Sequence, residues 1–206
     1  MSARDEVLAR IRAAVAPVAP ASELASVSYR ERGQLATPAV LDLLADRLAD
    51  YQAVVRRATT ATLAATIAAA LEQRGARRLV VPPGLDLPLP DWAEVTIDDA
   101  LSAAELDSLD AVITRAAVAI ADTGTIILDG SAGQGRRAIS LVPDYHLCVV
   151  RVEDVVETVP EAMDRLQATA GLATTFVSGP SATADIEMTR IKGVHGPRFL
   201  DVILVD

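Results

Sequence analysis

Cysteine and histidine are scarce in this chain. Among 206 residues, Cys148 is the single cysteine, and it lies in an apolar run, residues 147–150. One thiol cannot form a disulfide within the chain or hold an iron–sulfur cluster, and an apolar run suits a cysteine that packs as a small hydrophobic side chain. The two histidines, His146 and His195, have no second histidine or cysteine at ligand spacing. We therefore expect no metal and no cofactor on this chain.

Long basic runs and long apolar runs are missing as well. The formal net charge is −9, and no basic run exceeds a pair such as Arg56-Arg57. A surface of this charge repels phosphate backbones and anionic lipid headgroups, so nucleic-acid binding is not expected. No stretch reaches the length of a membrane helix, and charges in the first twelve residues break any signal-peptide apolar region. We expect a soluble, cytoplasmic protein without membrane insertion.

Aromatic residues make up only 3% of the chain, whereas hydrophobic residues make up 51%. The core must therefore consist of valine, isoleucine, leucine and alanine. These side chains fill parallel sheets and the helices that cover them. The length of the chain fits one domain with one extended core.

The sequence divides into a short N-terminal part and a longer regular part. Residues 3–16 place apolar side chains on one stripe of an amphipathic helix, which prolines end. Residues 17–36 are rich in proline and serine and are typical of a linker. We therefore expect an N-terminal helix and linker at residues 1–36 and the main domain at residues 37–206.

In the main domain, predicted helices alternate with predicted strands. Helices are expected at residues 37–48 and 59–74, each followed by a short apolar strand. This spacing is what right-handed parallel crossovers need, so the fold class is α/β with a mostly parallel sheet. Further strands are expected at residues 94–97, 111–114, 126–128, 147–152, 174–177 and 199–205. Two further helices are expected at residues 102–109 and 160–166.

Polar residues gather in the C-terminal segment, before its last predicted strand. The segment contains two glycine–proline turns, at residues 179–181 and 193–198. After the first turn come two hydroxyl residues and two carboxylates: Ser181, Thr183, Asp185 and Glu187. We interpret the segment as the rim of a ligand site, since such loops commonly carry function. The alternative is two ordinary turns flanking an exposed helix, with the acids as solvated residues of its first turn.

The first turn, residues 179–181, is typical of an anion-binding site. It follows a predicted strand, so we expect it at the carboxyl end of the sheet, where open α/β sheets bind ligands. The hydroxyls of Ser181 and Thr183, beside free amides at a helix start, suit a carboxylate or a phosphate. Asp185 and Glu187 oppose an anion unless they bind hydroxyls or are protonated.

The second turn adds a histidine and an arginine. His195 has the chemistry of a general acid or base, and Arg198 that of an anion clamp. The alternative for His195 is a turn residue that is hydrogen-bonded to the backbone. Because these alternatives stay open, binding is a safer prediction than catalysis.

A glycine-rich loop at residues 129–137 carries Arg136 and Arg137. It lacks the lysine of a phosphate-binding loop and does not match the dinucleotide fingerprint. As a positively charged lid it would cover an anionic ligand; the alternative is a long hairpin connection. The nearby turn Thr123-Gly124-Thr125 does not identify a function by itself.

Four segments, in this order, resemble the LUD-domain family. They are residues 121–126, the Gly135-Arg136-Arg137 loop followed by Pro143 and His146, residues 178–187, and residues 193–198. The resemblance covers residues 37–206. The candidate ligand-binding positions that it supports are Thr123, Gly124, Thr125, Arg136, Gly179, Ser181, Thr183, Asp185, Glu187, His195 and Arg198.

The resemblance implies a three-layer α/β/α fold, similar to the group of sugar-phosphate isomerases and CoA-transferases. It also implies a role beside two iron–sulfur proteins that oxidise L-lactate to pyruvate, with this chain as the short member that carries no cluster. We therefore expect an accessory subunit of a lactate-oxidising system, which binds a small carboxylate or phosphate or a partner surface.

Two rival functions stay open. One is a stand-alone enzyme on a phosphorylated or CoA-linked substrate, with Glu187 as base or nucleophile and His195 as acid, an assignment that fold analogy alone supports. The other is a regulatory or scaffolding protein. Since the family offers no established catalytic residue, Glu187 and His195 are only candidates for that role.

Overall fold

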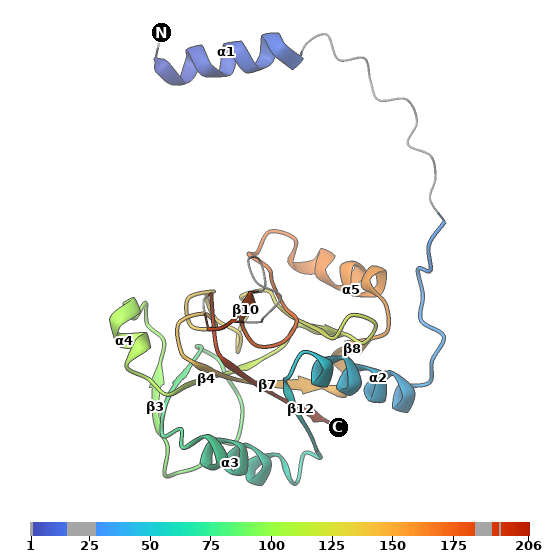
Figure 1. Ribbon diagram of the computed structural model, residues 1–206, viewed down its shortest axis with the longest axis vertical. Coiled ribbons are helices and arrows are strands. Elements are labelled where there is room, and N and C mark those ends of the chain that lie inside the picture. The colour runs from blue at the N-terminus through green and yellow to red at the C-terminus, as the bar shows by residue number, and fades with distance from the viewer. Residues whose placement is uncertain (1, 16–27, 184–190, 194) are drawn as a thin grey trace. The chain divides into compact units, whose positions relative to one another are not determined.

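The computed structural model describes residues 2–15, 28–183, 191–193 and 195–206. The chain divides into two compact units, Met1–Arg30 and Glu31–Asp206. The first contains helix α1 (Ala3–Val15), which buries none of its residues. The second contains all the other helices and strands of the described residues (Figure 1).

A six-stranded parallel sheet forms the centre of the second unit. Its order is β1-β12-β7-β4-β2-β3, and every neighbouring pair is parallel. The strands in chain order are β1 (Val54–Ala58), β2 (Arg78–Val81), β3 (Glu94–Ile97), β4 (Ala111–Arg115), β7 (Tyr145–Arg151) and β12 (Phe199–Val205). The α/β class predicted from the sequence is confirmed, and β3 lies at an edge as its weak apolar pattern suggests.

Helices cover both faces of this sheet (Figure 1). Aliphatic side chains of α3 (Leu63–Arg74) pack on Ile203 of β12, whereas leucines of α2 (Thr37–Asp50) pack on the neighbouring Val202. The difference follows from the strand, in which successive side chains point to opposite faces. The short helix α4 (Ala103–Asp107) begins with the capping box that the serine and glutamate spacing at its start predicts.

A second, four-stranded sheet lies on the α2 side of the core and was not predicted as a separate sheet. Its order is β8-β5-β6-β9, and β6 is antiparallel to both of its neighbours. Two residues separate β4 from β5, too few for a parallel crossover, so the chain passes from the central sheet into the second one, where β5 and β6 form an antiparallel hairpin. The strands are β5 (Val118–Ile120), β6 (Thr125–Leu128), β8 (Val155–Val156) and β9 (Thr175–Val177).

Smaller elements complete the unit. Helix α5 (Val159–Leu166) packs on the second sheet through Ala162 and Leu166. Two 3₁₀ turns flank this region, η1 (Val152–Asp154) and η2 (Gln167–Thr169), and β10 (Ala182–Thr183) pairs antiparallel with β11 (Ile191–Lys192). The apolar residues 139–142 form no strand.

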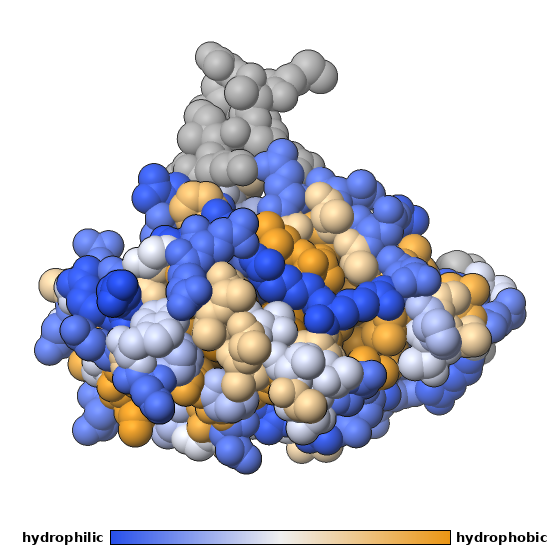
Figure 2. All heavy atoms as spheres, turned by 90° about the horizontal axis from the view of Figure 1, so that it is seen from below, coloured by the Kyte–Doolittle hydropathy of each residue, from blue (hydrophilic) through white to orange (hydrophobic). Residues whose placement is uncertain are grey.

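The surface seen from below in Figure 1 is shown in Figure 2. Hydrophobic residues occur on this face in patches that hydrophilic residues separate. Within the described ranges, no helix combines the length and the apolar composition that a membrane crossing needs.

Candidate functional site

The two glycine–proline turns meet in space. The backbone N–H of Ser181 donates to the Pro197 carbonyl at 2.8 Å, and the N–H of Gly193 donates to the Ser181 carbonyl at 3.0 Å. The N–H of His195 donates to Ser181 Oγ at 3.1 Å. Ser181 therefore joins the turns through both its backbone and its side chain. Its amide donates to Pro197 and strand β10 begins at the next residue, so Ser181 does not offer the free amide that was predicted. The rest of the predicted helix start, residues 184–190, lies outside the described residues.

The turns do not lie at the carboxyl ends of the central strands, and that prediction is also wrong. Strand β9, which the first turn follows, belongs to the second sheet. The central-sheet residues beside the turns are His146 and Leu200, which pair in register near the amino ends of β7 and β12. The site is therefore built from the loops that lead into these two strands and from the loop that leaves β9.

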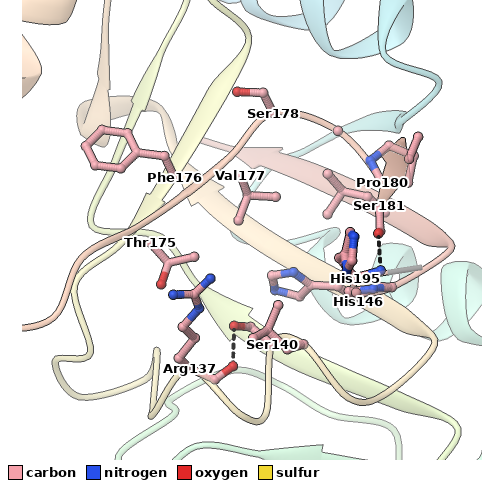
Figure 3. A pocket seen from close by; sticks show the side chains of 16 residues that line it. Arg137, Ser140, His146, Thr175, Phe176, Val177, Ser178, Pro180, Ser181 and His195 are labelled. Atoms are coloured by element: carbon pink, nitrogen blue, oxygen red, sulfur yellow. Dashed lines mark hydrogen bonds between the residues drawn. The ribbon is translucent and has the colours of Figure 1, made fainter. Parts of the chain in front are cut away.

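A cavity of about 300 Å³ opens between these loops (Figure 3). This volume is at the low end of ligand pockets, which span roughly 300–1,000 Å³, and it suits a small molecule. Polar and apolar groups both line it. The polar and glycine residues are Arg137, Ser140, His146, Thr175, Ser178, Gly179, Ser181, His195 and Gly196.

His146 lines the pocket from the central sheet and is 2% exposed. Its Nε2 lies 2.8 Å from Thr114 Oγ1 on the neighbouring strand β4. Burial lowers the pKa of the imidazole to about 4, because the charged form loses its hydration. The ring is therefore neutral at neutral pH and can bind as a donor or acceptor but not as a cation.

The two adjacent arginines of the glycine-rich loop differ. Arg136 donates two hydrogen bonds to Asp98, at 2.7 and 2.8 Å, and a third to the Leu101 carbonyl. These bonds hold the pKa of the Asp98 carboxyl below its usual value. Arg137 lines the pocket instead, and within the described residues no carboxylate pairs with its exposed guanidinium. The sequence-based assignment of Arg136 thus picked the neighbour of the residue that reaches the cavity.

The glycine-rich loop is not a hairpin connection, whereas its role as a lid stays a prediction. It connects β6 of the second sheet to β7 of the central sheet. The amide of Asp129 donates to Gln134 Oε1 at 2.6 Å, and Gln134 Nε2 donates to Ser131 Oγ at 2.9 Å. Gln134 is buried, so these hydrogen bonds hold the loop to itself on its interior side.

Arg198 lies outside the cavity and fixes the second turn. It donates two hydrogen bonds to Asp144, at 2.7 and 2.6 Å, immediately before β7. These hydrogen bonds hold the pKa of the Asp144 carboxyl below its usual value. A guanidinium occupied in this way holds the loop in position, and the pair joins the entrances of β7 and β12.

The turn at residues 123–125 contacts the site through one hydroxyl. Thr125 Oγ1 lies 2.7 Å from Thr123 Oγ1 and 2.8 Å from Ser178 Oγ, which lines the cavity. Gly124 takes a φ of +59°, and a Cβ on it would lie 2.7 Å from Arg47 Cβ, so glycine is needed for this close approach. Through Thr125, the turn holds the hydroxyl of Ser178, which lines the cavity.

The remaining predicted positions divide into two groups. Ser181, Gly179 and His195 line the cavity. Asp185 and Glu187 lie outside the described residues, and Thr183 is placed only as part of the backbone of β10. The candidate catalytic role of Glu187 therefore stays a prediction.

Sequence reasoning placed Arg137 only in a possible lid, and it missed His146, Thr175 and Ser178 as members of the site. For His146 a signal was available, because it stands next to the apolar residues 147–150, and a polar side chain at a buried position calls for an explanation. For Arg137 no signal distinguished it from Arg136, since the partner of Arg136 lies 38 residues earlier in the chain. Within the described ranges, no three histidine, cysteine or acidic side chains are placed to hold a metal ion.

The fold and the site together define an α/β protein with a small polar pocket at the entrance of two central strands. Comparison with known proteins identifies its family. The LUD domain matches residues 41–205. A lactate utilization protein C of Deinococcus radiodurans is 45% identical over 210 residues, which cover 98% of this chain and 95% of that protein. A lactate utilization protein C of Shouchella clausii is 33% identical over 114 residues, 53% of this chain and 49% of that protein.

The solved structures give the same result. A DUF162 family protein from Deinococcus radiodurans aligns with a TM-score of 0.74 and 44% identity, over 84% of this chain and 100% of that one. The chain therefore belongs to the LUD domain family, in the group of the lactate utilization C proteins. The resemblance seen in its C-terminal motifs is confirmed.

Proposed function

We propose that this protein takes part in lactate utilization as a cytoplasmic accessory subunit, and that its pocket binds a small carboxylate. The name of its relatives supports the pathway, and the pocket supports the ligand class. The observation that carries the proposal is that the exposed Arg137 and the neutral, buried imidazole of His146 line the same cavity of about 300 Å³. Arginine binds carboxylates through paired, charge-assisted hydrogen bonds.

The cysteine content supports an accessory role. The single thiol, Cys148, is buried, and burial raises its pKa to about 12. It is neither a cluster ligand nor a reactive nucleophile in this state. Electrons from lactate would therefore pass through iron–sulfur clusters on partner subunits, and this chain would hold the substrate, the product or a partner.

The test measures lactate-dependent dye reduction by the iron–sulfur proteins with and without this chain, and co-purification of the three proteins. We expect association and a higher rate when the chain is present. Arg137→Gln should reduce the gain in rate, whereas Arg57→Gln, which removes an exposed ion pair with Asp42, should leave it unchanged. Unchanged dye reduction together with no association would contradict the accessory role.

Binding is measured separately on the isolated chain by calorimetry with L-lactate, pyruvate and inorganic phosphate. A pocket built for carboxylates should bind at least one of the two acids. Tighter binding of phosphate, or turnover of a phosphorylated or CoA-linked compound by the chain alone, would favour the rival enzyme function.

A further inference from the structure

The His146 imidazole lines the cavity and has one nitrogen, Nδ1, to which no described residue is hydrogen-bonded. Among the described residues, Thr114 is the side chain that hydrogen-bonds this ring, and it does so at Nε2. Within the described residues, two fully buried side-chain atoms have no hydrogen-bond partner: Arg56 Nε and Tyr145 Oη. Nδ1 of His146 is not among them, and no described residue hydrogen-bonds it. The pocket is the opening that His146 lines.

We infer that His146 is the specificity-determining residue of the pocket, and that its Nδ1 hydrogen-bonds the oxygen on carbon 2 of a short carboxylate held by Arg137. This inference rests on the proposed carboxylate site and deepens it. It restricts the ligands to 2-hydroxy and 2-oxo acids. A carboxylate without that oxygen leaves a largely buried nitrogen unpaired, which disfavours its binding.

The hydroxyl behind the ring lets one histidine serve both ligand forms. Thr114 is fully buried, and its Oγ1 lies 2.8 Å from His146 Nε2 and 3.7 Å from Cys148 Sγ. When Thr114 donates to Nε2, the proton of the neutral ring is on Nδ1, which can donate to a 2-oxo group. When Nε2 donates to Thr114, the threonine proton can turn to the sulfur, and Nδ1 can accept from a 2-hydroxyl. Neither arrangement changes the net charge of the pocket.

The two polar contacts are separate in the fold, which fixes the orientation of the ligand. Arg137 comes from the loop before β7, whereas His146 comes from β7 itself (Figure 3). His195 lines the same cavity from the second turn and is exposed. It is therefore the rival candidate for the same contact, and the experiment has to distinguish the two histidines.

The experiment titrates the full chain with L-lactate, pyruvate, propionate and 3-hydroxypropionate by calorimetry. We expect lactate and pyruvate to bind about tenfold more tightly than the other two acids, the value of one unmet hydrogen bond in a buried site. Equal binding of all four acids would overturn the inference and leave the carboxylate site in place. Binding of none of them would overturn the carboxylate site as well.

Two variants assign the contact to a residue. His146→Phe keeps a ring of similar shape, and it should bring lactate down to the affinity of propionate. His195→Phe should keep the preference for lactate over propionate. Loss of the preference in His195→Phe alone would give the contact to His195 and overturn the inference. Because the acid series on the unaltered protein is independent of both variants, poor folding of His146→Phe leaves the inference testable.

Discussion

The two faces of strands β7 and β12 differ in how they treat buried polar groups. On the α3 face, the fully buried carboxylate of Asp201 accepts hydrogen bonds from Arg56 and Arg74, each at 3.1 Å. On the opposite face, Leu200 and the neutral His146 lie against the pocket. Adjacent residues of one strand thus serve different purposes, because alternate side chains point to opposite faces.

The comparison shows what burial requires of each group. A buried carboxylate keeps its charge only beside cations, and Arg74 is held over it by the Phe199 ring, 4.3 Å from the guanidinium carbon to the ring centroid. A buried histidine can instead give up its charge, so it needs no ion pair and keeps one nitrogen for a ligand. We therefore expect the loss of the buried carboxylate on the α3 face to change stability without changing binding, and the loss of a polar side chain of the pocket to change binding.

The largest expected effect is that of Asp201→Asn. The variant leaves two guanidinium groups, each about a quarter exposed, without their carboxylate. We expect the free energy of unfolding to fall by about 3 kcal/mol, at the low end of broken buried pairs because the arginines can recover some hydration. Urea unfolding measures this, and lactate affinity of the folded variant should not change.

The control for Asp201→Asn is Asp42→Asn. Asp42 is 72% exposed in its side chain and pairs with Arg57. Its loss should cost less than about 1 kcal/mol, as exposed ion pairs do. If both variants lose the same free energy, the distinction between the buried pair and the surface pair is wrong.

His146 should make stability depend on pH. Its pKa is about 4 in the folded protein and 6.5 in the unfolded chain, so the unfolded state binds more protons between these values. The contribution is fully present above pH 6.5 and is lost as the pH falls through this window. Between pH 7 and pH 5 we expect a loss of about 2 kcal/mol from this group.

The measurement is urea unfolding at pH 7 and pH 5 for the protein, His146→Phe and His195→Phe. His146→Phe should lack this part of the pH dependence. His195→Phe changes an exposed side chain and should retain this pH dependence. An unchanged pH dependence in His146→Phe would show that the imidazole is not held neutral by burial.

A third effect concerns the backbone that shapes the pocket. Gly179 takes a φ of +93°, and a Cβ on it would lie 2.5 Å from Tyr51 Cβ. Gly179→Ala should therefore reduce the free energy of unfolding by about 2 kcal/mol through strain and overlap. Gly171→Ala is the matched control, because a Cβ there meets nothing within 4 Å. Thermal unfolding compares the two, and equal midpoints would contradict the close approach.

The sequence predicted most of the central fold and less of the site, for physical reasons. Apolar strands such as residues 199–205 and the capping box at Ser102 depend on local pattern, and both are confirmed. The second sheet depends on a connection of two residues between β4 and β5, where the pattern alone was ambiguous. The composition of the two turns predicted one ligand rim, and both turns do line one cavity. Their place at the amino ends of β7 and β12 depends on strand order, which one sequence does not show.

The smallest effects are expected for variants of Arg136 and Arg137. These two neighbours give the sharpest comparison between a residue that supports stability and a residue that supports binding. Arg137→Gln should weaken lactate binding about tenfold and leave stability unchanged, since it removes an exposed guanidinium from the pocket. Arg136→Gln should do the reverse. It leaves the buried Asp98 carboxylate with fewer hydrogen-bond donors, so the free energy of unfolding should fall by about 1 kcal/mol, whereas lactate affinity should not change. Calorimetry and urea unfolding on both variants give four values. If Arg136→Gln weakens binding and Arg137→Gln does not, the arginine that the resemblance pointed to is the ligand contact and the pocket described here is not the carboxylate site.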